Sequence, residues 1–486
     1  MRVMAHERQA HPISLSPVER LVTILAGTWV VITPWFLGGQ TWWAQALGLV
    51  VGVIALAAAV SVRENRPVLI RFPIFWLGLF FLGYVACQSF NPWLAATPVQ
   101  PGAYVWSLAF PPHVAWLPAG VRADYGEDNT WREWVNWAGP WMLGCAWWAA
   151  VRRRRAAAWL WRLAFLNGVA IALVSLGYIY FPTKKILWFY VEPGQEIWLN
   201  IGWAHHIYIG AFTYTNAAAG FLYLCLAAGL ALTFHARERA RAVGRDSGLS
   251  WVILVGCGVV MAGIVISGSR GGLLFGGFLL VASVIRMAWE TLREQGWSLL
   301  HFLPGLGLLA AVILAAGSLL ISVKPVSVER LGQNLLDSNG RLDLWKSTVL
   351  MIKDRPWLGF GGGSYRYVSP FYFRKLGLFP DPDTLGGLQY RANHAHSDGL
   401  QFTMEYGVLG AGILLLMLLY WVGRVGGLAR WLGAKGWMVV LGLGATVVHS
   451  LVDFPFYNEA VLTLFTLLLI SVVKMAELNR SMEEGR

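Results

Sequence analysis

The residues best suited to acid–base chemistry lie in one segment, Asn393–Gly410, where a long polar stretch meets an apolar run. Asp398 followed by Gln401 predicts the start of a helix, because an aspartate caps the first backbone amides and a glutamine three residues later completes the capping box. The helix continues through Leu409–Val422, which is apolar enough to enter a bilayer. Helical spacing places four polar side chains on one stripe, namely His394, Asp398, Gln401 and Glu405.

His396 lies two residues before the predicted cap. Unpaired backbone N–H groups and the helix dipole at such a position favour a bound anion and a neutral imidazole, and a neutral imidazole can accept a proton. The alternative interpretation is a set of polar residues that finishes a membrane helix at the water interface. The spacing by itself leaves both interpretations open.

The composition predicts a membrane protein. Of the 486 residues, 57% are hydrophobic and only 13% are charged, about half the charged fraction of soluble domains. The 27 tryptophans agree, because Trp concentrates at membrane interfaces. The net charge of +12 does not require a nucleic-acid partner, since Lys and Arg on cytoplasmic loops explain much of it, and we expect none. The four cysteines all lie in apolar runs, which argues against a disulfide framework or a thiolate metal site.

Hydropathy predicts an all-α integral membrane fold, a polytopic bundle of about twelve transmembrane helices. Four groups of basic residues fall on one side of this arrangement, and the positive-inside rule makes that side cytoplasmic, together with both termini. These groups are Arg63/Arg66/Arg71, Arg152–Arg155, Arg237/Arg239/Arg241/Arg245 and Arg424/Arg430/Lys435. The predicted spans are 21–39, 42–62, 73–89, 134–151, 158–181, 207–233, 250–268, 271–288, 302–322, 404–423, 436–453 and 458–473.

Two long loops on the opposite, periplasmic side set the predicted domain organisation. Residues 1–322 form a transmembrane bundle of about nine spans with periplasmic loop 90–133, residues 323–403 a large catalytic loop, and residues 404–486 about three spans and a cytoplasmic tail. The second loop holds ten Lys and Arg against seven Asp and Glu, which indicates an anionic ligand on the outer face. Within it, Arg341–Ile352 has the spacing of an amphipathic helix.

Two arginines near glycines are candidate anion ligands. Arg270 lies in Gly268–Gly272, a short turn in which glycines let backbone amides approach a ligand. Its guanidinium can form paired hydrogen bonds with phosphate oxygens. The alternative is that Arg270 only anchors the helix at the membrane interface. Arg341 precedes a Pro- and Gly-rich run, Asp354–Ser364. That run lacks the Gly-Lys-Ser/Thr ending of a P-loop and the strand–helix frame of a dinucleotide site, so we predict a structural turn.

Two motifs have the form of metal sites. Asp381-Pro-Asp383 is similar to a two-carboxylate metal motif, but Pro-rich turns use the same residues and the loop is predicted to lie outside, so we reject it. His205-His206 has no third ligand at a useful spacing, so we predict no zinc site there.

Three further polar residues have two interpretations each. Asn216, inside a predicted span, is either a functional residue or a contact between helices. His449 and Asp453 are neighbours on a helix, at i and i+4, where the eleventh span ends. They either face the same cavity as His396 or serve the structure alone.

The strongest motifs follow a definite order: Ser269-Arg270-Gly271, Arg341 with Trp345, Arg355-Pro-Trp-Leu-Gly359, and His394-Ala-His396-Ser with Leu400, Glu405 and Gly407. This order resembles the O-antigen ligase/polymerase family, which includes O-antigen ligases, O-antigen polymerases and bacterial protein O-oligosaccharyltransferases. The resemblance is most specific over Ile264–Gly412 and weaker through Asn216 and His449–Phe454. Family members typically have His-Asn where this chain has His396-Ser397, which keeps the histidine and removes the amide.

The resemblance implies a membrane-embedded, GT-C-like glycosyltransferase in the bacterial cytoplasmic membrane, with its active site on the periplasmic face. It implies a polyprenyl-diphosphate-linked glycan as donor, and a glycan, lipid A–core or protein as acceptor. It implies no metal and no other cofactor. Membrane lipid and polysaccharide assembly or export proteins are the other expected partners.

The expected roles of residues follow from the same resemblance. Arg270 and Arg341 hold the donor diphosphate and stabilise charge on the leaving group, while His396 takes the proton of the attacking acceptor hydroxyl, with inversion. Whether His394 or His396 is the base stays open. The residues expected to bind or orient substrate are Arg355, His394, Glu405, Asn216 and Asp453. No motif names the acceptor, and we favour a surface-polysaccharide ligase or polymerase over protein transfer.

A transporter or flippase of a lipid-linked glycan is the alternative function, since it would also need many spans and a basic cavity. Transporters usually show repeated halves with helices broken near the midplane, and the sequence predicts neither. Its polar residues cluster at one face instead. A passive subunit of an export complex would explain the apolar bundle but not the ordered His and Arg motifs.

Overall fold

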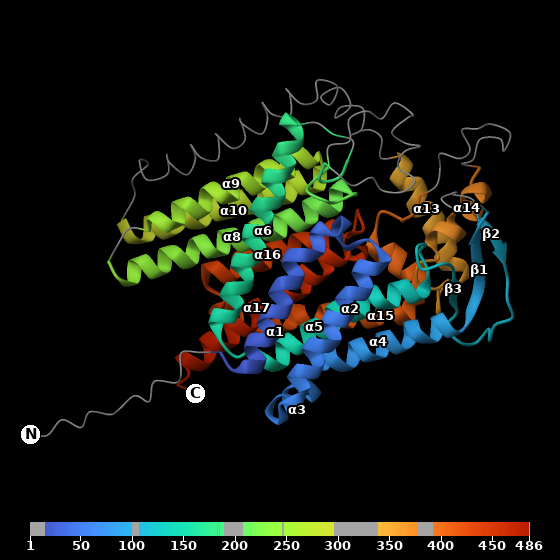
Figure 1. Ribbon diagram of the computed structural model, residues 1–486, viewed down its shortest axis with the longest axis horizontal. Coiled ribbons are helices and arrows are strands. Elements are labelled where there is room, and N and C mark those ends of the chain that lie inside the picture. The colour runs from blue at the N-terminus through green and yellow to red at the C-terminus, as the bar shows by residue number, and fades with distance from the viewer. Residues whose placement is uncertain are drawn as a thin grey trace, which may run out of the picture.

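The computed structural model describes residues 15–99, 106–181, 183, 185–188, 208–244, 247–295, 339–377 and 392–485, and these are mostly helical (Figure 1). The first half contains α1 (Pro17–Ile32), α2 (Trp42–Ser61), α3 (Arg66–Ile70), α4 (Pro73–Phe90), α5 (Thr130–Ala150) and α6 (Arg154–Tyr180). The remainder of the chain contains α8 (Thr215–Ala242), α9 (Gly248–Ser267), α10 (Arg270–Gln295), α13 (Asn339–Asp354), α14 (Tyr365–Lys375), α15 (Asp398–Gly427), α16 (Gly433–His449) and α17 (Glu459–Glu483). The strands are β1 (Pro92–Pro98), β2 (Trp106–Ala109) and β3 (Gly120–Arg122).

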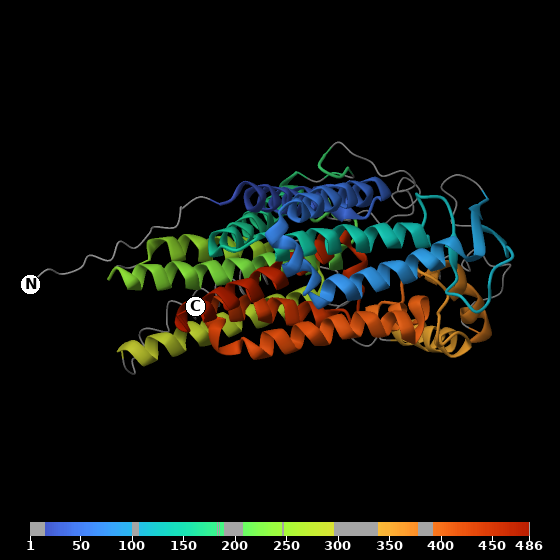
Figure 2. The ribbon, with the colours of Figure 1, turned by 90° about the horizontal axis from the view of Figure 1, so that it is seen from below.

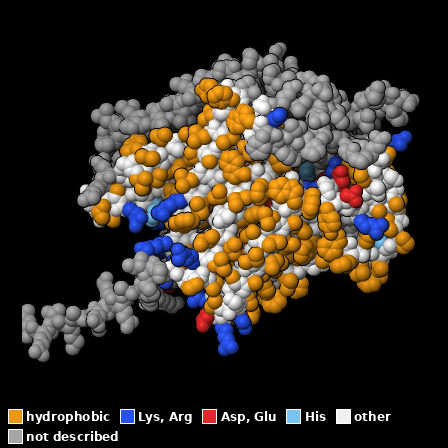
Figure 3. Space-filling view, viewed as in Figure 1, with side chains coloured by type: hydrophobic (Ala, Val, Ile, Leu, Met, Phe, Trp, Pro, Cys, Tyr) orange, Lys and Arg blue, Asp and Glu red, His pale blue; other side chains and the backbone are white. Residues whose placement is uncertain are grey.

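The molecule has two chemically different ends (Figures 1 and 2). The strand end carries the three strands together with α13 and α14. The basic end lies opposite, and apolar side chains cover most of the visible face between the two (Figure 3). The predicted basic groups meet at the basic end through contacts of Arg152 with Asn65 (3.0 Å), Arg154 with the Leu478 carbonyl (3.0 Å) and Lys435 with Glu238 (2.6 Å). Described members of the four groups, or their direct neighbours, therefore lie at this end, while Arg245 lies outside the described residues.

Eight of the described helices are long and apolar enough to cross a membrane: α2, α4, α6, α8, α9, α10, α15 and α17. The helices α1, α5 and α16 lie where further spans are predicted but do not meet that standard, and α1 and α16 have only 16 and 17 residues. The predicted span 302–322 lies outside the described residues. The fold is thus a multi-pass helical membrane protein, whereas the predicted number of about twelve spans is not confirmed.

The helix α8 lies at the centre of the bundle and α15 at its edge. The most apolar stretch of α8 is completely buried, whereas only 11% of the corresponding stretch of α15 is. Small residues let helices approach closely: a Cβ at Gly139 of α5 would lie 3.1 Å from the backbone of Gly48 on α2. Such packing matters because lipid tails leave little hydrophobic driving force between helices.

The predicted all-α class holds for the described residues, which are mostly helical, but loop 90–133 also contains a small three-stranded sheet that the sequence does not predict. The strand order is β2-β1-β3, with β2 antiparallel to β1 and β3 parallel to it. Leu94 and Val121 on the inner face of this sheet pack against Tyr367 of α14. The sheet thus buries its apolar face against a segment more than two hundred residues away in the chain, a pairing that local spacing does not predict.

The helix α15 is interrupted at Gly407, which has a φ of +64° and a ψ of −179°. The sequence predicts an unbroken helix capped by Asp398, and both details are wrong. Ser397 is the cap, because its Oγ accepts a hydrogen bond from the Leu400 N–H at 3.4 Å. A break in a membrane helix frees backbone groups, and these must find partners inside the protein.

The Pro- and Gly-rich run supplies those partners. Three backbone hydrogen bonds close the gap, from Val408 to Pro356 (2.8 Å), from Phe360 to Met404 (2.9 Å) and from Gly361 to Glu405 (2.7 Å). Glycine is required at Gly359, which has a φ of +70° and where a Cβ would overlap the Glu405 carbonyl. The predicted structural turn is confirmed, and it seals the break in α15.

Replacing Gly407 with alanine should destabilise the protein. Its backbone conformation suits glycine, and a Cβ there would overlap the Trp357 carbonyl. We expect a loss of about 1–3 kcal/mol, measured as a lower melting temperature of the purified protein. The matched control is Gly423→Ala in the same helix, where a Cβ meets open space. Equal melting temperatures for the two variants would contradict the prediction.

Candidate active site

Asp453 lies in the turn between α16 and α17, outside both helices, and is the centre of a buried polar cluster. Its Oδ1 accepts hydrogen bonds from Tyr214 Oη and from the Phe454 N–H, both at 2.9 Å. Its Oδ2 accepts one from Asn216 Nδ2 at 2.5 Å, and the same amide donates to Tyr214 Oη at 2.9 Å. These donors satisfy a carboxylate that burial would otherwise destabilise.

Two histidines flank this carboxylate. His396 Nδ1 lies 3.5 Å from Asp453 Oδ1, and His449 Nε2 lies 3.7 Å from Oδ2. Burial by itself raises the pKa of Asp453, but the contact with His396 and the charges of both histidines outweigh it, so this pKa lies below its ordinary value. A carboxylate that stays ionised can orient an imidazole and stabilise it once it gains a proton.

Accessibility separates the two histidines. The side chain of His396 is 28% exposed, whereas His449 is buried with its Nδ1 3.3 Å from Tyr223 Oη. The His396 backbone is held in place, because its carbonyl accepts from Trp345 Nε1 at 3.3 Å. Its φ of +51° is a left-handed conformation that few residues other than glycine adopt. His396 is therefore the imidazole beside Asp453 that a second molecule can reach.

Two of the predicted arginines begin helices that meet this cluster. Arg341 is exposed at the start of α13, and its Nη1 donates to the Val452 carbonyl at 3.0 Å. Arg270 is exposed at the start of α10. The residue after it, Gly271, contacts His449 so closely that a Cβ would overlap the imidazole. The first turns of α10 and α13 therefore both lie beside the histidine–aspartate cluster, and each carries an arginine, a residue type that can make paired hydrogen bonds with phosphate oxygens.

His394 has different surroundings from His396. Its Nδ1 accepts a hydrogen bond from Gln401 Nε2 at 3.2 Å, and its ring stacks on Phe454 with centroids 4.0 Å apart. Loss of hydration in this packing lowers the pKa of His394 to about 4. His394 is therefore neutral at pH 7 and a much weaker base than an ordinary histidine.

Gln401 links His394 to the buried Glu405. Its Nε2 also donates to Glu405 Oε1 at 3.1 Å, and its Oε1 accepts from the Ala395 N–H at 2.9 Å. Glu405 Oε2 accepts from Tyr457 Oη at 2.7 Å. The glutamine therefore fixes the backbone at Ala395, and the glutamate holds the amide of the glutamine in place. Of the four side chains predicted to lie on one stripe of the helix, those of His394, Gln401 and Glu405 are thus linked by hydrogen bonds.

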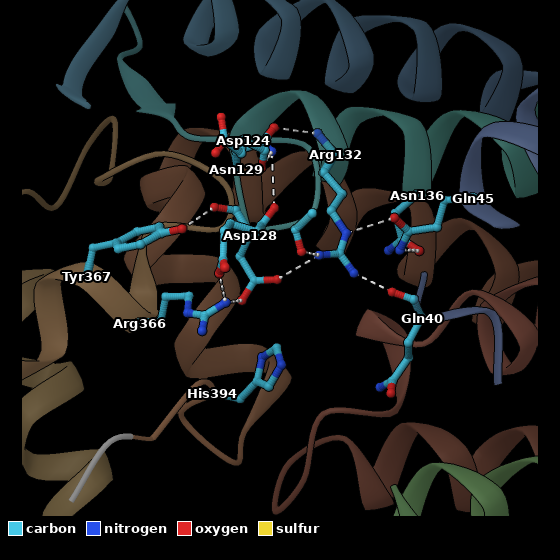
Figure 4. A network of polar contacts seen from close by, with 12 residues as sticks. Gln40, Gln45, Asp124, Asp128, Asn129, Arg132, Asn136, Arg366, Tyr367 and His394 are labelled. Carbon is cyan, nitrogen blue, oxygen red and sulfur yellow. Dashed lines mark hydrogen bonds and ion pairs between the residues drawn. The ribbon is translucent and has the colours of Figure 1, made fainter. Parts of the chain in front are cut away.

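A second network holds the loop before α5 close to His394 (Figure 4). Arg366 of α14 pairs with Glu127 and Asp128 at 2.9 and 3.2 Å, and Arg132 pairs with Asp128 at 3.4 Å. Burial by itself raises the pKa of Asp128, but the charges of the two guanidinium groups outweigh it, so this pKa lies below its ordinary value. Since carboxylates already neutralise these arginines, they hold the loop in place and are poor candidates for a substrate phosphate.

Arg355 is not brought to the cluster. Arg341 begins α13 and Arg355 follows its end, so about 20 Å of helix lies between them. The Arg355 guanidinium instead lies over the rings of Trp93 and Phe360, 4.0 and 4.7 Å from their centroids. This placement favours a structural contact between β1 and the turn after α13.

Three tyrosines of the site were not selected from the sequence. Tyr214 and Tyr223 reach the cluster from the start and the body of α8, and Tyr457 from the turn before α17. Tyr214 had one signal, because it lies in the polar stretch Thr213–Asn216 of an otherwise apolar region. Tyr457 had none, since an aromatic residue two positions after a proline is ordinary in a membrane protein.

The two rejected metal motifs, His205-His206 and Asp381-Pro-Asp383, lie outside the described residues. Within the part of the chain that the structure describes, no group of three or more His, Cys, Asp and Glu side chains is arranged to hold a metal ion.

Residues 255–415 match the family model described as O-antigen ligase. The match covers about a third of the chain, from α9 into α15, and includes Arg270, Arg341 and His396. It confirms the resemblance carried by the motifs. Asn216 and Asp453 lie outside the matched region, yet the fold brings them to His396. No curated protein matches the chain.

The low pKa of His394 predicts a pH-dependent stability. An unfolded histidine titrates near pH 6.5, so below that pH the unfolded chain gains a proton that the folded His394 takes up only near pH 4. Stability should therefore fall as the pH is lowered from 6.5 to 4. In His394→Phe, which keeps an aromatic ring against Phe454, the melting temperature should fall less over this range than in wild type. The melting temperature of the exposed control His113→Phe should fall as much as that of wild type. Equal falls in melting temperature for all three proteins would refute the low pKa of His394.

Proposed function

We propose that the protein is a membrane glycosyltransferase that moves glycan from a polyprenyl-diphosphate donor to an acceptor hydroxyl, because residues 255–415 match the family model described as O-antigen ligase. The observation that carries this proposal is the partly exposed His396 beside the buried Asp453, with Arg270 and Arg341 at the edge of the same cluster. The strand end is then the periplasmic face, and the basic end is cytoplasmic.

His396 is the general base in this proposal. Its Nδ1 faces Asp453, so a hydrogen on Nδ1 leaves the Nε2 lone pair free to accept the proton of the acceptor hydroxyl. The hydroxyl oxygen forms a bond to the anomeric carbon as the bond from that carbon to the diphosphate oxygen breaks. The diphosphate leaves with the electron pair, and the ionised Asp453 stabilises the imidazolium. A single displacement of this kind inverts the anomeric centre.

The low pKa of His394 supports the choice of His396 over His394 as base. A conjugate acid with a pKa of about 4 belongs to a weak base, and Gln401 already occupies the Nδ1 lone pair of His394. The place of His394 in the reaction is to position its neighbour, through Gln401 and Glu405.

Arg270 and Arg341 bind the diphosphate of the donor. Charge builds up on the leaving oxygen as the bond breaks, and fixed guanidinium donors aimed at that oxygen stabilise the transition state more than the ground state. The acceptor is a hydroxyl of a glycan or of lipid A–core in a ligase or polymerase of surface polysaccharide, and this assignment rests on the family alone.

The assay that tests the proposal is glycan transfer by the purified protein in lipid bilayers. It is supplied with a polyprenyl-diphosphate glycan and separate candidate acceptors. Longer lipid-linked chains would identify a polymerase, and glycan on lipid A–core a ligase. His396→Ala should lower the rate at least a hundredfold because the base is removed, and the exposed control His113→Ala should keep it. Movement of the donor across the bilayer without any transfer would refute the proposal and favour a flippase.

Arg341→Lys should reduce transfer about tenfold or more. Lysine keeps the charge, but its single ammonium cannot make the paired hydrogen bonds that a guanidinium makes with phosphate oxygens. The matched control is Arg374→Lys, an exposed arginine in the same long loop. Turnover by Arg341→Lys at the rate of Arg374→Lys would exclude a paired contact between Arg341 and the diphosphate.

A further inference from the structure

Apolar side chains lie exposed on the segment that joins β2 to β3. Its stretch Phe110–Leu117 contains no Asp, Glu, Lys or Arg, and Phe110 and Trp116 are 65% and 78% exposed. Val114, between them, is exposed as well. Apolar side chains that gather on an exposed surface mark a contact with a partner protein or with a membrane. The stretch therefore indicates a docking surface for an apolar neighbour.

One side chain attaches this segment to the end of α4. Asn91 is the first residue after that helix, and its Nδ2 donates to the carbonyls of Val114 (2.9 Å) and Pro118 (3.2 Å), while its Oδ1 accepts from the Val114 N–H (2.8 Å). The helix α4 is apolar enough to cross a membrane, and its 18 residues span about 27 Å, close to the thickness of a bilayer core (Figure 1). The segment is therefore held at the level where α4 leaves the membrane core.

Further exposed aromatic rings lie next to this segment. Phe90 ends α4 and is 78% exposed, and Trp357, in the turn that seals the break in α15, is 66% exposed. Trp93 joins that turn to the segment, because its ring centroid lies 6.0 Å from that of Phe110 and its Nε1 donates to the Phe360 carbonyl at 2.7 Å. Tryptophan rings at the ends of spans form the aromatic belts of membrane proteins. Their position here favours a membrane over a partner protein as the neighbour.

The exposed aromatic residue Tyr125 has the opposite surroundings. It is 60% exposed and belongs to the same connection between α4 and α5, but it lies between Asp124 and Glu127. Carboxylates are costly to remove from water, so this part of the connection stays hydrated. The connection thus has an uncharged part attached to α4 and an acidic part after β3, and only the uncharged part is suited to enter lipid.

We propose that Phe110, Val114 and Trp116 insert into the membrane leaflet on the strand side and anchor the strand end to the bilayer surface. The partner of this surface is the interfacial layer of the bilayer, where a tryptophan ring is most stable because it is apolar and carries one polar N–H. The proposal rests on the multi-pass membrane fold and does not depend on the transfer reaction.

Hydrogen bonds connect this anchor to the break in α15. The Val121 N–H of β3, the strand after the segment, donates to Thr130 Oγ1 at 2.8 Å. That hydroxyl donates to the Gly362 carbonyl at 2.9 Å, in the Pro- and Gly-rich run that seals the break. The anchor therefore holds the strand end, and the polar part of α15 with it, at a fixed height over the membrane.

The reactivity of introduced cysteines tests this placement. Trp116→Cys and the control Tyr125→Cys are made in the full-length protein, in bilayers of phosphatidylethanolamine and phosphatidylglycerol with no other protein. The reagent is a methanethiosulfonate with a sulfonate group, and mass spectrometry of the peptide with the new cysteine keeps the native cysteines out of the measurement. Trp116→Cys should react about tenfold or more slowly than Tyr125→Cys, because lipid excludes the charged reagent and disfavours the reactive thiolate. Equal rates would overturn the proposal.

Photolabelling identifies what covers the segment. The probe is phosphatidylethanolamine with a diazirine near the ester end of one acyl chain, added to the wild-type protein in the same bilayers. Peptides from Phe110–Leu117 should carry the label, and peptides around Tyr125 should not. Slow reaction of Trp116→Cys without label on Phe110–Leu117 would overturn the proposal, because the chain itself would then cover the segment. Fast reaction without label would overturn it too and leave the surface to a partner protein.

A charge at Trp116 should lift the segment into water. The thiol of Phe110→Cys should react about fivefold or more faster when it is combined with Trp116→Asp, because a carboxylate is costly in lipid. The matched control combines Phe110→Cys with Tyr125→Asp, which adds the same charge to the hydrated part and should leave the rate unchanged. Since Trp116 and Tyr125 are both largely exposed, neither change removes a buried contact. An equal rate at Phe110→Cys with and without Trp116→Asp would show that Trp116 is no anchor.

Discussion

The buried carboxylate of Asp453 is the contact on which the strand end of the molecule depends. A charge at this depth is stable only with several donors, and these come from two distant parts of the chain: Tyr214 and Asn216 from the start of α8, and His396 from the segment before α15. The backbone of the same turn holds two more elements, since the Asp453 carbonyl binds the first N–H of α15 and the Val452 carbonyl binds Arg341. One side chain and its neighbours thus bring together residues that are more than two hundred positions apart.

The break in α15 gives the active site its second support. The helix must supply Glu405 to the polar cluster and also an apolar face to the membrane, and the change of direction at Gly407 separates these two tasks. The Pro356–Gly361 turn satisfies the freed backbone groups, and Tyr84 of α4 donates to the carbonyls of both Leu358 and Tyr406 at 2.8 Å. The polar end of α15 is thereby rigid, which a site that aligns a base with a leaving group requires.

The range of the interactions decides which features the sequence predicts and which it does not. Local patterns predict the helix around Arg341, the turn at Gly359 and the common side of the basic groups, because each depends on residues within one turn or one loop. The sheet in loop 90–133, the tyrosines on Asp453 and Glu405, and the break at Gly407 depend on contacts between distant segments. The cap at Ser397 instead of Asp398 is a different case, since both residues cap helices well and the docking of Asp398 on Ser450 decides between them.

The break in α15 also bears on the alternative of a transporter, since broken helices mark the ion and substrate sites of many transporters. In those proteins the freed backbone groups face a ligand near the midplane. Here protein groups satisfy them, and the break lies only nine residues from the start of the helix, near the strand end. A groove along α15, between it and α5, α16 and α17, continues from this end and is lined mostly by apolar side chains, so it offers a glycan almost no hydrogen-bond partners. This combination, polar chemistry at one end and an apolar groove beneath it, favours an enzyme that acts at one face of the membrane over a transporter.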